Sequence, residues 1–291
     1  MMATDPPAKV SRHPVLDRLR RDRRARLAAP VLLLLVLAAA ARPLISGRMK
    51  ETDTSRLLAG PSTEHWMGTD ELGRDVLSRV IAGAVVTVEV ATLTVGASLV
   101  VGTVIGLIAG HRGGWLDAVI MRLSDGLLAF PLLVLALTVV AALGPGLHNA
   151  LIAIAVVTTP RFARVVRGEV LSLRTREWVS AARIMGVSET VVMRRHLLPH
   201  LAGTLLVFAA LQVSTAIMAE AALSFLGLSV QPPQPSWGAM VESGTDHLDA
   251  SWSLSVFPGL AILLTVAAFN LLADALRDAL DAHRPELAPA R

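Results

Sequence analysis

Long uninterrupted apolar runs recur along the chain and constrain its fold more than any other feature. A helix needs roughly 20 apolar residues to cross a bilayer, and several runs approach that length. Only 17% of the residues are charged, whereas soluble domains carry about 25%. A transmembrane β-barrel would show alternating segments of about 10 residues, but these runs are continuous. The sequence therefore predicts an all-α, polytopic membrane protein and argues against a soluble enzyme.

Apolar length predicts six transmembrane helices, with short breaks between some of them. The predicted spans cover about 28–46, 82–110, 119–142, 147–166, 201–223 and 256–275. The first span follows a basic segment, so a cleaved signal peptide is an alternative interpretation. We favour a retained helix, because the basic segment is long and the run is nearly long enough to span.

The distribution of lysine and arginine predicts the orientation of the chain. With a cytoplasmic N-terminus, the inner segments hold 21 of the 27 Lys and Arg residues and the outer segments hold 6. Cytoplasmic loops carry such an excess. We therefore expect cytoplasmic tails at 1–27 and 276–291, an extracytoplasmic segment at 47–81 and a cytoplasmic loop at 167–200. Because orientation accounts for the basic surplus, we expect the lipid bilayer as a partner and no nucleic acid.

One face of the second predicted span consists of small residues. The residues four apart on this face are Ser98, Gly102, Gly106 and Gly110. Small residues at this spacing let a neighbouring helix approach closely. Such a seam could join two subunits or two helices of this chain, and we favour packing within the bundle.

A few polar and acidic side chains interrupt the predicted spans. Gln212, Ser214 and Thr215 form a polar stripe on the fifth span. They could line a hydrated path or hydrogen-bond between helices. Acidic residues inside a membrane are candidates for contact with a substrate or a proton. Glu220 therefore joins the stripe as a candidate pathway residue, while the roles of Glu89 and Glu220 stay open.

The sequence lacks the motifs of an enzyme or an ATP-binding protein. It has no cysteine, which excludes disulfides and thiolate catalysis. It contains no G-x-x-x-x-G-K-[ST] phosphate-binding loop, no His/Asp/Glu cluster with metal spacing and no G-x-S-x-G nucleophile elbow. We expect no catalytic, metal or cofactor site in this chain. Energy for active transport would have to come from another protein.

A polar, arginine-rich segment at 177–200 stands between two apolar runs. The i, i+3, i+4, i+7 spacing of an apolar helix face occurs at Trp178, Ala181, Ala182 and Met185. Gly186 supplies a helix stop, and Ser188 suits the N-cap of a second helix running to about Leu197. Pro199 is expected to close that helix before the fifth span. Such a hairpin could dock on a partner or lie on anionic lipid.

The same segment resembles the signature of ABC importer membrane subunits, which reads E-A-A, three residues, Gly, nine residues, Ile-x-Leu-Pro. The corresponding residues here are Ser180, Ala181, Ala182, Gly186, His196, Leu198 and Pro199. The glycine spacing and the Leu-Pro are kept, whereas Ser180 replaces Glu and His196 replaces Ile. The resemblance implies that these residues form the coupling hairpin, which docks into a groove on an ATPase.

Other stretches resemble the dipeptide and oligopeptide permeases among these subunits. The first is HWMGTDELGRDVLSRVIAGA at 65–84, and further similar stretches lie at 143–186, 219–240 and 258–281. One departure is Val85, where the family usually has Arg. The resemblance implies a type I ABC importer permease core at 82–275.

The resemblance also implies partners and a function. The expected partners are a homologous second permease subunit, two cytoplasmic ATPase subunits that carry the ATP and Mg, and an extracytoplasmic peptide-binding protein. The expected function is import of di- or oligopeptides across the cytoplasmic membrane. One alternative keeps this architecture and imports nickel, heme or glutathione. Another is a stand-alone secondary transporter or channel.

Overall fold

A computed structural model describes residues 14–45, 47 and 51–281 of the 291-residue chain. Parts of both predicted tails, at 1–13 and 282–291, therefore lie outside the described residues, as do residues 46 and 48–50. The described chain is helical, and within it the one β-type pairing is an isolated bridge between Thr69 and Asp75. The predicted all-α fold is confirmed.

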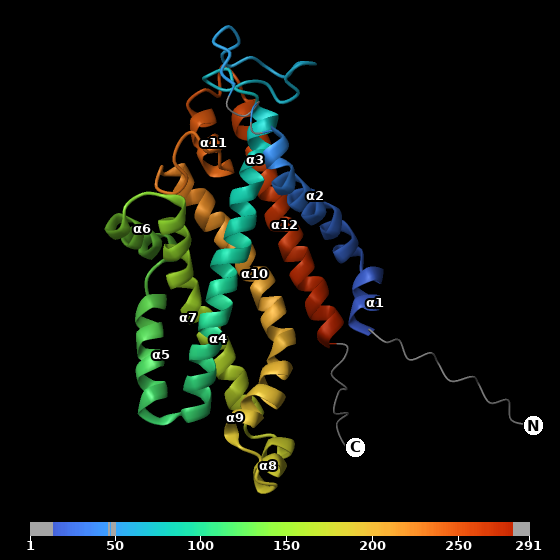
Figure 1. The fold of residues 1–291 in the computed structure, drawn as a ribbon, viewed down its shortest axis with the longest axis vertical. Helices are drawn as coiled ribbons and strands as arrows, with labels where there is room; N and C mark the ends of the chain where they lie inside the picture. Colours follow the sequence, from blue (N-terminus) through green and yellow to red (C-terminus); the bar gives the residue numbers. More distant parts are fainter. Residues whose placement is uncertain (1–13, 46, 48–50, 282–291) are drawn as a thin grey trace, which may run out of the picture.

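The helices run up and down one elongated bundle (Figure 1). In chain order they are α1 Pro14–Arg21, α2 Arg23–Ile45, α3 Val76–Glu89, the π-helical turn η1 Val90–Thr94, α4 Val95–Arg112, α5 Gly114–Leu128, α6 Leu132–Leu143, α7 Leu147–Leu173, α8 Glu177–Ile184, α9 Glu189–Val191, the π-helical turn η2 Val192–Leu197, α10 Leu198–Phe225, α11 Trp237–Thr245 and α12 Ser253–Asp281.

Five helical stretches of the described chain are long and apolar enough to cross a membrane. They are Arg23–Ile45, Val76–Arg112, Leu147–Leu173, Glu189–Phe225 and Ser253–Asp281. A sixth span results if α5 and α6 are counted together as one bent pair. The chain is therefore a multi-pass membrane protein.

The third predicted span, at 119–142, is not one straight helix. α5 ends at Leu128, α6 begins at Leu132, and the two are bent by 94°. Pro131 stands at the break with extended backbone angles, since proline cannot continue the hydrogen bonding of the preceding turn and pushes the residue before it out of the helical region. Phe130 and Pro131 are apolar, so hydropathy does not detect this corner.

The predicted helix end at Pro199 is also wrong. The helix runs on from Glu189 to Phe225, with Pro199 in the first turn of α10. The wider turn η2 directly precedes this proline. A proline inside a helix removes one backbone hydrogen bond and crowds the preceding turn. The wider π-helical turn before Pro199 changes the hydrogen-bond register, so the chain passes the proline without leaving the helix. The second helix of the hairpin is therefore continuous with the fifth span.

The small-residue seam joins two helices of this chain, as favoured from the sequence. A Cβ atom added at Gly102 would lie 2.4 Å from the Cβ of Phe162 in α7. One added at Gly106 would lie 2.5 Å from the carbonyl oxygen of Ala163. The Ser98 hydroxyl donates to the Ala155 carbonyl oxygen at 3.2 Å. Only residues without bulky side chains allow α4 and α7 to approach this closely.

The two ends of the bundle differ in character (Figure 1). α8 and α9 lie at one end, which we call the hairpin end. Residues 51–75 and α11 lie at the opposite end, which we call the loop end. Large apolar side chains of α2, α4, α10 and α12 are exposed between the ends, for example Leu34, Val100, Leu206 and Leu263. Exposed apolar surface of this extent suits contact with lipid.

Candidate functional site

The hairpin at 177–200 begins with a short helix that stops sharply. α8 ends at Ile184, and Gly186 has a φ of 78°. The backbone N–H of Val187 donates to the Ala182 carbonyl oxygen at 3.1 Å. This bond closes the helix end in the pattern that needs a left-handed residue, usually glycine, just past the helix. The predicted stop at Gly186 is confirmed.

The apolar residues predicted for one face of α8 differ in their burial. Val179 and Ala182 are buried and face the bundle. Ala181 is exposed, and Met185 is 74% exposed. The residues that face inward are those that meet the rest of the bundle, which the spacing within α8 alone does not specify.

The outward side of α8 presents large apolar side chains. Ile184 is 87% exposed and adjoins Met185. Ser180 and Ala181 are also exposed. Ile184 and Met185 thus form an exposed apolar pair at the end of α8 and the start of the turn that follows it.

Trp178 connects the two arms of the hairpin. Its ring centroid lies 6.1 Å from that of His196 and 5.9 Å from that of His200. His196, one of the two departures from the signature, thus lies against Trp178, with its ring tilted by 48° to the indole. Leu198 and Pro199, the last signature residues, are exposed beside it.

Polar contacts hold the base of the hairpin on the bundle. The His111 Nε2 atom at the end of α4 lies 3.4 Å from a carboxylate oxygen of Glu189. The Arg174 guanidinium, just after α7, donates to the Gly110 carbonyl oxygen at 3.2 Å. The first contact ties the hairpin to the end of α4, and the second joins the ends of α4 and α7 beside it.

α5 is fixed to α7 by ion pairs near the same end. The Arg167 guanidinium donates to both carboxylate oxygens of Asp117, at 2.5 and 2.7 Å. Arg164 pairs with Asp125. Bidentate arginine–carboxylate pairs are geometrically specific, so they orient α5 against α7.

The four candidate pathway residues have different surroundings, and three of them lie in the middle of α10. Ser214 is buried and donates to the Val266 carbonyl oxygen of α12 at 3.2 Å. Thr215 donates to the carbonyl oxygen of Leu211, within its own helix, at 3.3 Å. The Gln212 side chain is buried, and its Nε2 atom has no hydrogen-bond partner among the described residues.

Glu220 lies in a buried serine network. Its Oε1 atom accepts hydrogen bonds from Ser224 at 2.8 Å and from Ser229 at 3.0 Å. Ser236, the N-cap of α11, donates to the Ser224 hydroxyl at 2.8 Å. Glu220 therefore connects the end of α10 to the chain that follows it and to α11.

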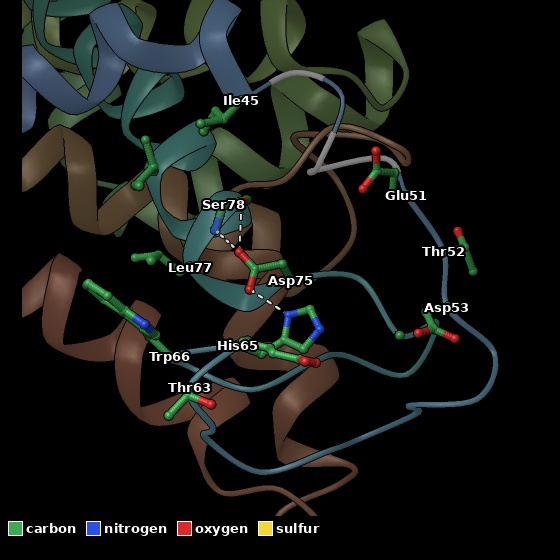
Figure 2. A pocket seen from close by; sticks show the side chains of 13 residues that line it. Ile45, Glu51, Thr52, Asp53, Thr63, His65, Trp66, Asp75, Leu77 and Ser78 are labelled. Carbon is green, nitrogen blue, oxygen red and sulfur yellow. Dashed lines mark hydrogen bonds and ion pairs between the residues drawn. The ribbon is translucent and has the colours of Figure 1, made fainter.

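At the loop end, a chain of hydrogen bonds fixes residues 51–75 on α3 (Figure 2). The Asp75 carboxylate accepts from the backbone N–H of Ser78 at 2.8 Å and from the Ser78 hydroxyl at 2.6 Å. Its other oxygen lies 3.0 Å from Nδ1 of His65. Burial raises the pKa of Asp75, but the hydrogen bonds from Ser78 and His65 lower it more, so it lies below its ordinary value.

Arginine and tryptophan contacts complete the loop end. Arg74 and Arg79 both contact the buried Asp70 carboxylate, at 2.7 and 3.3 Å. The Trp237 indole of α11 donates to the Val80 carbonyl oxygen at 2.8 Å. The sequence predicts residues 47–81 only as an extracytoplasmic segment and does not predict these contacts. The Asp75-x-x-Ser78 pattern before an apolar run is a helix-start signal that could have located α3.

Comparisons with known proteins match most of this chain. The family model described as binding-protein-dependent transport system inner membrane component matches residues 102–284. The dipeptide transport system permease protein DppC of Alkalihalophilus pseudofirmus is 43% identical over 265 residues, which are 90% of this chain and 87% of that protein. The glutathione transport system permease protein GsiD is 44% identical over 229 residues in Pectobacterium atrosepticum, covering 79% of this chain and 76% of that protein. In Escherichia coli it is 43% identical over 271 residues, covering 92% and 89%.

Proposed function

The chain belongs to the family of binding-protein-dependent transport system inner membrane components, and from this premise we propose that it imports short peptides across the cytoplasmic membrane. It is the membrane-spanning permease component of an ABC importer. ATP and Mg bind on separate ATPase subunits, so the chain itself performs no catalysis. Relatives named for dipeptide and for glutathione transport support a short peptide as the cargo, because glutathione is itself a tripeptide.

The proposed assembly contains four kinds of subunit. This chain pairs with a homologous second permease, two ATPase subunits bind at the hairpin end, and a peptide-binding protein docks at the loop end. The hairpin end is then cytoplasmic, as are both chain termini. The distribution of 21 against 6 Lys and Arg residues supports this orientation.

The exposed apolar tip of α8 carries the proposal for the ATPase contact. Burying a side chain the size of Ile or Met stabilises an interface by about 1.5–3 kcal/mol. Ile184 and Met185 are 87% and 74% exposed, so nearly all of this gain is available to a partner. Ser180, Ala181 and Gly186 shape the same outward surface, while Ala182 lies beneath it. This is helix-in-groove recognition, and the continuous helix from Glu189 to Phe225 transmits the resulting movement.

Two neighbouring alanines provide a matched test of this docking face. The chain has no cysteine, so Ala181→Cys and Ala182→Cys each create a single labelling site. Each variant is coexpressed with the second permease and the ATPases, labelled with benzophenone maleimide and irradiated. We expect Ala181→Cys to crosslink to an ATPase subunit, because Ala181 is exposed, and Ala182→Cys to react at least tenfold less, because Ala182 is 6% exposed.

Mass spectrometry of the crosslinked product identifies the partner. Equal crosslinking from both positions would mean that α8 does not present the outward face described here. Crosslinking of Ala181→Cys to lipid alone would favour a hairpin that lies on the membrane surface.

The alternative cargoes and mechanism have separate readouts. Nickel or heme as cargo would appear as retention of that substrate, in place of a peptide, by the partner binding protein. A stand-alone secondary transporter or channel would move substrate in proteoliposomes that lack the ATPase subunits. Uptake that requires both ATP and the ATPases supports the importer.

A further inference from the structure

A small cleft lies near the loop end, between four parts of the chain. Arg42 of α2, Glu89 of α3 and His148 of α7 line it, together with Gln231 and Gln234 of the loop before α11. Its volume is about 250 Å³. We call it the outer cleft. It is separate from the hairpin and from the larger pocket that Figure 2 shows, whose lining residues include Glu51, Trp66 and Ser78.

The outer cleft contains two opposite charges that do not neutralise each other. Arg42 and Glu89 are both half-buried. Their charged atoms are more than 4.0 Å apart, because no ion pair joins them, and neither side chain has a hydrogen-bond or ion-pair partner among the described residues. By contrast, Asp70 and Glu64 of the loop end each form an ion pair with an arginine.

Unpaired charges are expensive where water is scarce. Arg42 lies in the last turn of α2, and Glu89 is the last residue of α3, within the long stretch Val76–Arg112. Ionisable side chains within membrane segments usually pair with one another or face a hydrated cavity with a function. Here both face the same cavity, and apolar side chains such as Val85 and Val86 form the rest of its wall.

We propose that the outer cleft binds a small zwitterion, with its ammonium group on Glu89 and its carboxylate on Arg42. The guanidinium of Arg42 matches a carboxylate in bidentate geometry, and the Glu89 carboxylate accepts hydrogen bonds from an ammonium group. The side-chain amide of Gln234 supplies further donors and acceptors. A free amino acid or the two ends of a dipeptide carry this pair of charges.

The size of the outer cleft limits the ligand. Pockets for drug-sized ligands have volumes of about 300–1,000 Å³, and this one is smaller. A dipeptide is only about 7 Å long when extended, whereas each further residue adds about 3.5 Å. The inference rests on the proposed function and restricts the cargo to very short peptides. The permease itself contacts both ends of such a peptide, in addition to any selection of cargo by the binding protein.

Photolabelling of the assembled transporter without the binding protein tests this directly. The probe is the dipeptide alanyl-photoleucine, and the competitors are Ala-Ala, N-acetyl-Ala-Ala and Ala-Ala amide. We expect labelled residues within 82–89 or 146–148, and competition by Ala-Ala at least tenfold stronger than by either blocked peptide, since a blocked end forfeits one charge-assisted contact.

Variants separate the two charges. Glu89→Gln should abolish the preference for a free amino end, and Arg42→Gln the preference for a free carboxyl end. Arg42→Lys and Glu89→Asp keep the charges and should keep most of the labelling, which separates loss of charge from loss of fold. Arg56→Gln and Glu242→Gln, at exposed positions outside the cleft, serve as controls and should change nothing.

Labelling elsewhere in the chain, or equal labelling in wild type and both neutral variants, would overturn the inference. ATP-driven peptide uptake with the binding protein present is measured in parallel on the wild type. Its absence contradicts the proposed function, whereas normal uptake with labelling outside the outer cleft contradicts only the zwitterion site.

Discussion

Gly106→Ala is expected to destabilise the protein by forcing α4 and α7 apart. The new Cβ atom would lie 2.5 Å from the Ala163 carbonyl oxygen and 2.7 Å from the Val166 Cβ atom. Non-bonded carbon atoms prefer about 3.5–4.0 Å, so the helices must separate by about 1 Å. Overpacking of this kind costs about 1–3 kcal/mol.

Gly96→Ala provides a control on the same helix. A Cβ atom there meets nothing within 4 Å. Both changes give the same gain in helix propensity, about 0.5–1 kcal/mol, so their difference isolates the clash. A difference of about 1–3 kcal/mol corresponds to about 2–12 °C in the midpoint of thermal unfolding.

The assay is thermal unfolding of the purified chain in detergent, followed by the intrinsic fluorescence of its five tryptophans. We expect Gly106→Ala to unfold at a lower temperature than Gly96→Ala. Equal midpoints would refute the tight α4–α7 seam. If Gly106→Ala instead left this chain stable and weakened its pairing with the second permease, the seam would lie between subunits.

Two further predictions concern the loop end. Glu220→Ala should lower the free energy of unfolding by about 1–3 kcal/mol, because the hydroxyls of Ser224 and Ser229 lose their acceptor. Chemical denaturation measures this change. Ser214→Ala, which loses one interhelical hydrogen bond, serves as the reference and should lower the free energy of unfolding less. The pKa of Asp75 is lower in the folded protein than its ordinary value, so its stabilisation is complete above the unfolded pKa of about 3.9 and is lost as pH falls through the folded pKa. Hydrogen exchange in residues 51–75 should therefore accelerate below about pH 4. Asp75→Asn retains an N-cap acceptor, so its exchange should depend less on pH. An acid response in Asp75→Asn equal to that of the wild type would contradict the Asp75 assignment.

Local sequence patterns determined much of this fold. Apolar length predicted the membrane-spanning helices, because a span must satisfy its own backbone and present apolar side chains over a fixed thickness. Gly186 predicted the end of α8, since a left-handed residue favours glycine whatever surrounds it. The small residues from Ser98 to Gly110 predicted a close helix contact for the same local reason.

Tertiary structure decided which side chains meet. Val179 and Ala182 of α8 face inward because the bundle lies on that side. The spacing within the helix does not specify which face meets the bundle. The corner at Pro131 joins two apolar helices that hydropathy cannot separate. Glu220 meets Ser229, and Arg42 lines one cleft with Glu89, because helices distant in sequence are packed together. A sequence pattern specifies the faces of each helix, but the partner of each face follows from how the whole chain buries its surfaces.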